Sequence, residues 1–209
     1  MKKLLLSLFL MFPLTRCGPN CGTGKVRPYY DLQEVNVVTA HVVRVTSPSG
    51  SSSLIFPDLA AGRPVLPDSL ALRVDGTVTY HASIREPFGR SAWEAYACSP
   101  APDGFEGSKE SVKELTVRSE QDFDATHPAG SSLNEYFEYI NTDDYTVDVV
   151  RRESVAEYTR RLPLMPPRHF VLRLRMAPAQ KAGSYTFTVH YELTNGEVYT
   201  ARIDNITFR

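Results

Sequence analysis

The chain has 209 residues, of which 42% are hydrophobic and 22% are charged, and its formal net charge is −1. This composition excludes an intrinsically disordered chain and a fibrous repeat, and the length allows one or two domains. A charge so close to zero provides no field that would attract nucleic acid, so we expect no nucleic-acid partner.

Residues 1–16 are predicted to be a signal peptide. Lys2 and Lys3 give a positive start, and residues 4–14 form an apolar run. That run is shorter than the roughly 20 residues that span a bilayer, and it is typical of the h-region of a secretory signal. Its removal, with Arg16, takes three of the 23 basic residues and none of the 24 acidic ones, which leaves a net charge of −4.

The stretch Leu14-Thr15-Arg16-Cys17 resembles the bacterial lipobox, in which the cysteine receives a diacylglyceryl group and becomes the mature N-terminus. We therefore expect Cys17 to carry a lipid, with the membrane as a partner through that lipid. Arg16 stands where a small residue is usual. The alternative is a plain secretory signal cut elsewhere, with Cys17 as an ordinary thiol.

Two further cysteines remain, Cys21 and Cys98. Exported proteins meet an oxidising environment, so these two are predicted to form a disulfide. The alternative is a pair of free thiols with Cys98 buried. The chain has no Cys-x-x-Cys pair, so it supports neither a zinc site nor a redox motif of that type.

Residues 17–31 are predicted to form a flexible tether, because Gly, Pro and Asn are frequent in them. Strand patterns then run to the end, so residues 32–209 are expected to form one domain. Residues 34–45 favour a strand, and 47–53 favour a loop. Alternating runs on both sides of Asp75-Gly76 predict a β-hairpin with its turn there.

The last third of the chain has the clearest strand pattern. Asn195-Gly196 predicts a tight turn between two strands, and a bulge is expected near Asp204-Asn205. Capping-box patterns predict two short helices, beginning at Ser132 and at Ser154. Further strands are predicted at 93–98, 115–119, 170–176, 185–193 and 198–208.

Many short strands joined by turns, without regular βαβ alternation, indicate a mainly β fold. We expect an antiparallel, immunoglobulin-like β-sandwich with one or two short helices. The Cys…Trp…Cys spacing of antibody domains is missing, so the likeness lies in the architecture.

The chain resembles uncharacterised lipoproteins of the Bacteroidetes type, a family of unknown function. The resemblance covers most of the mature chain and implies export. It also implies a β-rich domain that a lipid anchors to the cell envelope, at the outer membrane. It does not imply whether the domain faces the periplasm or the cell surface. It implies no activity. It is carried by Lys2-Lys3…Cys17 and by residues 97–107, 115–119, 122–124 and 127–134.

Two side-chain sites follow from short patterns. Such bacteria O-glycosylate Asp-Ser/Thr followed by an apolar or small residue, and Asp68-Ser69-Leu70 matches, so Ser69 is a possible glycan site. Asp122, Asp124 and His127 offer carboxylate and imidazole ligands for a metal. The alternative for these three is that they turn the backbone and cap the next element.

No nucleophile, nucleotide or hydrolase motif occurs, so we expect no cofactor and no enzymatic activity. The predicted role is a non-catalytic binding or assembly module with a protein or glycan partner. The alternative is an envelope hydrolase or a metal-dependent enzyme whose site is built from loops. An exposed apolar patch would favour the first role, and a pocket with converging polar groups the second.

Overall fold

The structure is a computed structural model, which describes residues 27, 29–46, 52–81, 103–104, 106–142, 152–179 and 183–209. Most of the described residues lie in β-strands, so the prediction of a mainly β protein is confirmed. The strand predicted at 93–98 lies outside the described residues. The two short helical elements are η1 (Pro67–Ser69) and α2 (Val155–Thr159).

The strands form three sheets. The largest has the order β5 (Gly107–Ser108), β1 (Tyr29–His41), β4 (Leu70–His81), β9 (His169–Leu174), β7 (Phe137–Asn141), β8 (Arg152–Ser154). The second has the order β11 (Val198–Thr207), β10 (Ser184–Leu193), β6 (Val112–Ser119). A separate hairpin pairs β2 (Val43–Thr46) with β3 (Ser52–Ile55). All neighbouring strands are antiparallel except β1 and β5.

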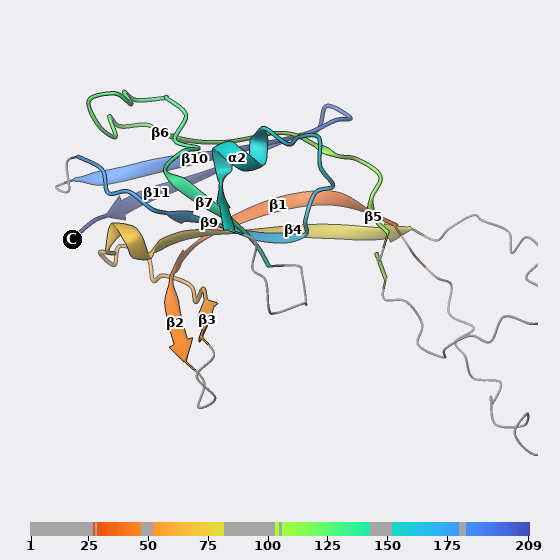
Figure 1. Cartoon of the computed structure of the whole chain (residues 1–209), viewed down its shortest axis with the longest axis horizontal. Coiled ribbons are helices and arrows are strands. Elements are labelled where there is room, and N and C mark those ends of the chain that lie inside the picture. Colours follow the sequence, from red (N-terminus) through yellow and green to blue (C-terminus); the bar gives the residue numbers. More distant parts are fainter. Residues whose placement is uncertain are drawn as a thin grey trace, which may run out of the picture.

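The two larger sheets enclose one apolar core (Figure 1). Phe137 of β7 and Phe187 of β10 join the sheets, with ring centroids 5.8 Å apart. The six-stranded sheet curls into a half-barrel around the core, and an immunoglobulin-like strand arrangement is not confirmed. The largest fully buried side chains are Tyr191, Phe123, Phe137, Phe170, Phe187, Leu70, Leu72, Leu115, Leu133, Ile140, Leu172 and Leu174.

The hairpin of β10 and β11 confirms the prediction from Asn195-Gly196. Gly196 has a φ of 89°, a left-handed conformation that glycine adopts without strain. The predicted bulge is present as well, because the register shifts between Tyr185 and Phe187 while β11 holds extra residues around Asn205, whose φ is 62°. Both features are local, so the sequence alone could predict them.

The hairpin predicted at Asp75-Gly76 is wrong. β4 runs through this dipeptide without a turn and pairs with β1 on one side and β9 on the other. The Gly76 amide donates to the Arg168 carbonyl at 2.6 Å, and a Cβ at this position would lie 2.5 Å from Cδ1 of Leu32. Gly76 is therefore needed for a close approach of three segments and not for a turn.

The helix predicted from Ser132 is also wrong, because Phe137–Asn141 forms strand β7. β7 lies between β9 and β8, and its first four residues are all buried. A strand buried on both faces shows no alternation, so its apolar spacing can imitate a helix. Asn134 fixes the turn before it, because its side chain accepts from the Val117 amide and donates to the Leu115 carbonyl, both at 2.9 Å.

The second predicted helix is confirmed as α2. Ser154 Oγ accepts from the Glu157 amide at 3.1 Å, and the Glu157 carboxylate accepts from the Ser154 amide at 2.8 Å. This is the reciprocal capping box that the sequence indicates. Val155 and Tyr158 form its buried side, and Tyr158 stacks on Tyr139 of β7 at 4.1 Å.

Candidate functional site

Several predicted site residues cannot be placed. Cys17, Cys21 and Cys98 lie outside the described residues, so the lipid and the disulfide stay predictions. Ser69 ends η1 and is half-buried, and its hydroxyl lies 3.4 Å from the Asp68 carboxylate. A glycan on Ser69 stays a prediction too.

The structure brings Asp124 and His127 together but leaves Asp122 apart. Asp124 Oδ1 accepts from the Thr126 hydroxyl at 2.7 Å and lies 2.9 Å from His127 Nδ1. The other ring nitrogen of His127 lies 2.9 Å from Glu135 Oε1. Asp122 instead accepts from the Ala129 amide at 2.8 Å. Sequence reasoning missed Glu135 as a member of this group.

These contacts determine the charges in the loop. Hydrogen bonds from Thr126 and then from His127 hold the pKa of Asp124 well below its usual range. The Asp124 carboxylate raises the pKa of His127, and the charge of Glu135 adds to this effect. The Tyr136 hydroxyl donates to Asp124 Oδ2 at 2.8 Å, which raises the pKa of Tyr136. The arrangement favours the turn-and-cap interpretation over the metal, since the ligand atoms already hold the loop.

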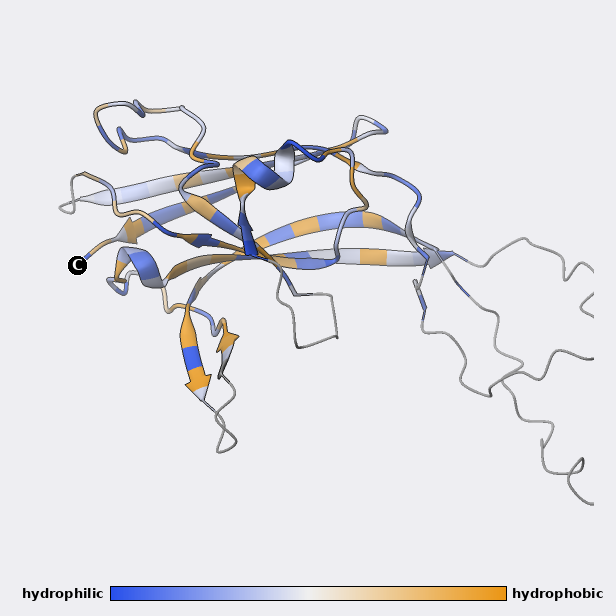
Figure 2. Cartoon of the chain, in the orientation of Figure 1, coloured by the Kyte–Doolittle hydropathy of each residue, from blue (hydrophilic) through white to orange (hydrophobic). Residues whose placement is uncertain are grey.

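A different region has the form of a binding site. The β2–β3 hairpin projects from the body of the molecule, away from the three-stranded sheet (Figure 1). Its two strands carry apolar residues (Figure 2), of which Val45 is 42% and Ile55 is 47% exposed. Within the described ranges no third strand pairs with this hairpin. A two-stranded ribbon is marginal in water by itself, so its exposed apolar side chains suit it to a partner.

The base of the hairpin is anchored on the outer face of the six-stranded sheet. Val42 and Phe56, which flank the two strands, pack on a small second cluster of buried residues there. Backbone bonds add to this anchor, because the His41 amide donates to Pro57 at 3.0 Å and the Val42 amide to Ser69 at 2.9 Å. The hairpin is thus a projecting arm with a fixed base. The cluster consists of Ala40, Ala71, Ile140 and Val171.

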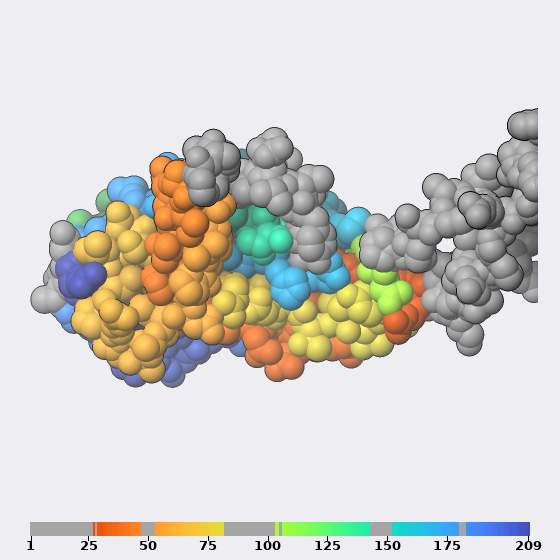
Figure 3. All heavy atoms as spheres, turned by 90° about the horizontal axis from the view of Figure 1, so that it is seen from below, coloured from red at the N-terminus to blue at the C-terminus, as the bar shows by residue number. Residues whose placement is uncertain are grey.

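A pocket of about 180 Å³ lies beside this base. Nδ1 of His41 is buried there without a hydrogen-bond partner among the described residues. Arg63 and Arg209 add two cations to the pocket, and neither has a carboxylate side-chain partner among the described residues. Figure 3 shows the dark blue C-terminal residues beside the gold segment that follows the hairpin. The pocket is lined by His41, Val42, Leu59, Arg63, Pro64, Val65, Leu66, Ser69 and Arg209.

Sequence reasoning missed this arm and its pocket. The pattern at 34–45 predicts one strand, whereas the chain leaves the sheet at Val42 and begins a new strand. The available indication was Val43 and Val45 on one side of the Ser-Pro-Ser-Gly loop and Leu54-Ile55 on the other, a hairpin pattern with a longer loop.

In the part of the chain that the structure describes, no helix has the length and apolar character needed to cross a membrane. No protein-family model matches the chain, and comparison with curated proteins and with solved structures gives no match. The resemblance to Bacteroidetes lipoproteins therefore stays a prediction from the sequence.

Proposed function

We propose that this chain is a lipid-anchored protein of the cell envelope that binds another envelope protein through the β2–β3 hairpin, without catalysis. The observation that carries the proposal is the projecting hairpin with Val45 and Ile55 exposed beside a pocket that contains Arg63 and Arg209. Apolar side chains supply binding energy when they leave water, and the cations would select an acidic segment of the partner.

A protein partner is favoured over a glycan by the kind of side chain that is exposed. Carbohydrate sites use exposed aromatic rings, whereas none of the large exposed hydrophobic residues of the described ranges is aromatic. Val45 and Ile55 lie on the hairpin, and Leu66 lines the pocket beside its base. We also propose that the domain is an immunoglobulin-like β-sandwich, an architecture that suits a binding role.

The alternative role, a hydrolase or metal-dependent enzyme, has weaker support. The paired acid and imidazole of Asp124 and His127 are not among the residues that line the pocket. An active site needs such groups to converge where a substrate can bind.

The anchor and the arm are tested separately. Replacement of Cys17 by serine should move the protein from the membrane fraction to the soluble fraction, and unchanged partition would contradict the lipid anchor. For the arm, a photo-crosslinking residue is placed at position 45 in cells, with position 198 as the matched control, because Val198 is also an exposed valine and lies on the three-stranded sheet. Position 45 should give one discrete adduct that position 198 lacks.

The same adduct should be weakened when the pocket charge is reversed in Arg63→Glu. It should also be reduced by Ile55→Ser, since Ile55 pairs with Val43 on the same ribbon. Identical adducts from positions 45 and 198, or an adduct that neither substitution affects, would refute the arm as the binding surface.

A further inference from the structure

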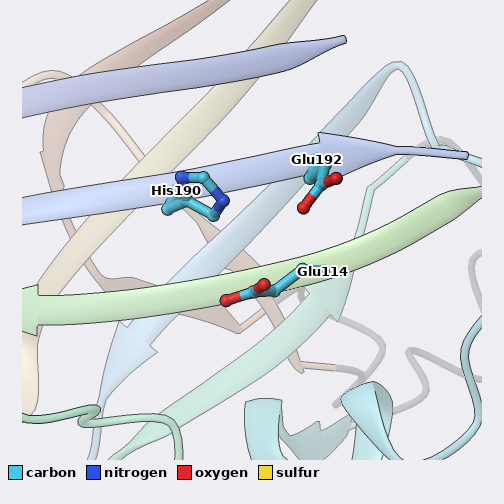
Figure 4. Close-up of side chains that lie close together, drawn as sticks. All are labelled: Glu114, His190 and Glu192. Atoms are coloured by element: carbon cyan, nitrogen blue, oxygen red, sulfur yellow. The ribbon is translucent and has the colours of Figure 1, made fainter. Parts of the chain in front are cut away.

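The outer face of the three-stranded sheet holds a group of three metal-ligating side chains, Glu114, His190 and Glu192 (Figure 4). Glu114 of β6 lies directly opposite Glu192 of β10 in the antiparallel register. His190 precedes Glu192 by two residues, so both side chains point to the same face of the strand. One ligand atom from each of the three lies within 4.8 Å of the others.

The surroundings of these side chains leave ligand atoms available. His190 has no hydrogen bond or ion pair with any described residue. Oε1 of Glu114 accepts from the Thr116 hydroxyl at 2.7 Å, and Oε1 of Glu192 accepts from the Lys113 ammonium at 2.6 Å. Each carboxylate therefore keeps its second oxygen, and the bond from Thr116 orients Glu114 in the way that outer partners orient metal ligands.

The pairing of the two glutamates has a cost that a cation would remove. Like charges directly opposite each other on neighbouring strands destabilise a sheet. Lys113 offsets part of this repulsion, but it contacts Glu192 and is itself largely exposed. A divalent ion between the three side chains would neutralise both carboxylates and use the imidazole of His190, which has no partner among the described residues.

We propose that Glu114, His190 and Glu192 bind a divalent transition-metal ion, with Zn²⁺ as the ion that fits best. An imidazole nitrogen with two carboxylate oxygens suits Zn²⁺, whereas Mg²⁺ and Ca²⁺ take oxygen ligands. Bonds of about 2.0–2.2 Å to zinc require only a modest closing of these side chains. Water would fill the remaining coordination positions, because each of the three side chains is partly exposed and none of them lines the pocket.

The test is a Zn²⁺ titration of the tag-free mature protein in competition with a chromophoric chelator, with Co²⁺ absorption as a second readout. We expect one ion per chain. His190→Gln, Glu114→Gln and Glu192→Gln should each weaken binding by about 10-fold or more, as loss of a ligand does. Binding should also weaken in acid, because metal ligands must be deprotonated to bind.

Lys113→Gln is the most informative variant, because it should raise the affinity for Zn²⁺ where the three ligand variants lower it. Removing the ammonium frees Oε1 of Glu192, so the affinity for Zn²⁺ should rise several-fold. A purely structural role of these side chains would not produce that gain. Lys113 is exposed and the other three positions are half-buried, so circular dichroism checks that each variant is folded.

Two histidine variants serve as controls. His169→Gln, on the six-stranded sheet beside Asp75, should leave Zn²⁺ binding unchanged. His127→Gln tests whether Zn²⁺ binds at the Asp124 loop instead, and this variant should also leave Zn²⁺ binding unchanged. The proposal is overturned if wild-type protein binds Zn²⁺ no tighter than millimolar, if His190→Gln binds as wild type does, or if His127→Gln alone abolishes binding.

Discussion

At the residue scale, the best-defined polar group is the imidazole of His127 between two carboxylates. Both of its ring nitrogens lie 2.9 Å from a carboxylate oxygen, of Asp124 on one side and Glu135 on the other. The charged imidazolium is the form that can donate to both at once. The ring also meets Tyr136 edge-on at 4.7 Å, and Tyr136 stacks on buried Phe123. The group thus fixes this loop to the core.

The raised pKa of His127 predicts a pH-dependent contribution to stability. A histidine whose pKa is higher in the folded state stabilises fully below its unfolded pKa of about 6.5, and the contribution is lost as the pH rises through the folded value. His127→Gln should therefore destabilise the protein more at pH 6 than at pH 9. Urea unfolding at both pH values measures this difference.

The contribution of Asp124 to stability changes with pH in the opposite direction, and it does so in a lower pH range. Its lowered pKa means that its contribution is present above about pH 4 and is lost as the pH falls further. Measurements at pH 6 and above therefore isolate His127. A stability difference between wild type and His127→Gln that grew as the pH rose would contradict this account.

At the element scale, β4 shows how packing overrides a turn pattern. Asp75 forms an ion pair with Arg73 at 2.8 Å on the sheet surface, and its other carboxylate oxygen lies 3.2 Å from His169 Nδ1. Gly76, next to it, is where the Arg168 carbonyl and the Leu32 side chain reach the strand. The two residues that predict a turn therefore have other functions in an unbroken strand.

Gly76→Ala tests this interpretation of β4. The new methyl group would meet Leu32 Cδ1 at 2.5 Å and the Arg168 carbonyl oxygen at 2.9 Å, and the backbone oxygen cannot move freely. Overpacking of this kind costs about 1–3 kcal/mol, to be measured by chemical denaturation. Thr77→Ala, at the exposed neighbouring position, should change stability by about 0.5 kcal/mol or less. Equal effects of the two substitutions would refute the packing role of Gly76.

At the scale of the whole molecule, aromatic rings join the sheets into one folding unit. Phe187 of β10 contacts Phe137 of β7 and Phe123 of the loop after β6, with centroids 5.8 Å and 6.4 Å apart. The side chains of both sheets belong to one contiguous cluster. We therefore expect the described sheets to unfold together.

Phe187→Ala should remove about 3–5 kcal/mol from the free energy of unfolding, because it leaves a cavity between the sheets. Thr188→Ala, the next residue on the outer face, should have little effect. Guanidinium denaturation followed by both circular dichroism and fluorescence gives the values. Two separate transitions in wild-type protein would show that the sheets unfold independently, and that result would contradict the prediction from a single shared core.

The sequence by itself determined the features that depend on neighbouring residues. These are the mainly β class, the turn at Asn195-Gly196, the bulge at Asn205 and the capping box of Ser154 with Glu157. Each is decided within a few residues by backbone conformation or a local hydrogen bond. At Asp124 and His127 the contacts are likewise between near neighbours in the sequence, and they form the turn that the sequence analysis gives as the alternative to a metal site.

Only the tertiary structure decided where segments distant in the sequence meet. The strand character of β7 depends on β8 and β9 on its two sides, and the course of β4 depends on Leu32 and Arg168. The arm depends on how Val42 and Phe56 pack, and the Glu114–His190–Glu192 group on the register between β6 and β10. Such contacts are selected by burial of the whole core, and a periodic pattern in one segment carries no information about the register of its partner.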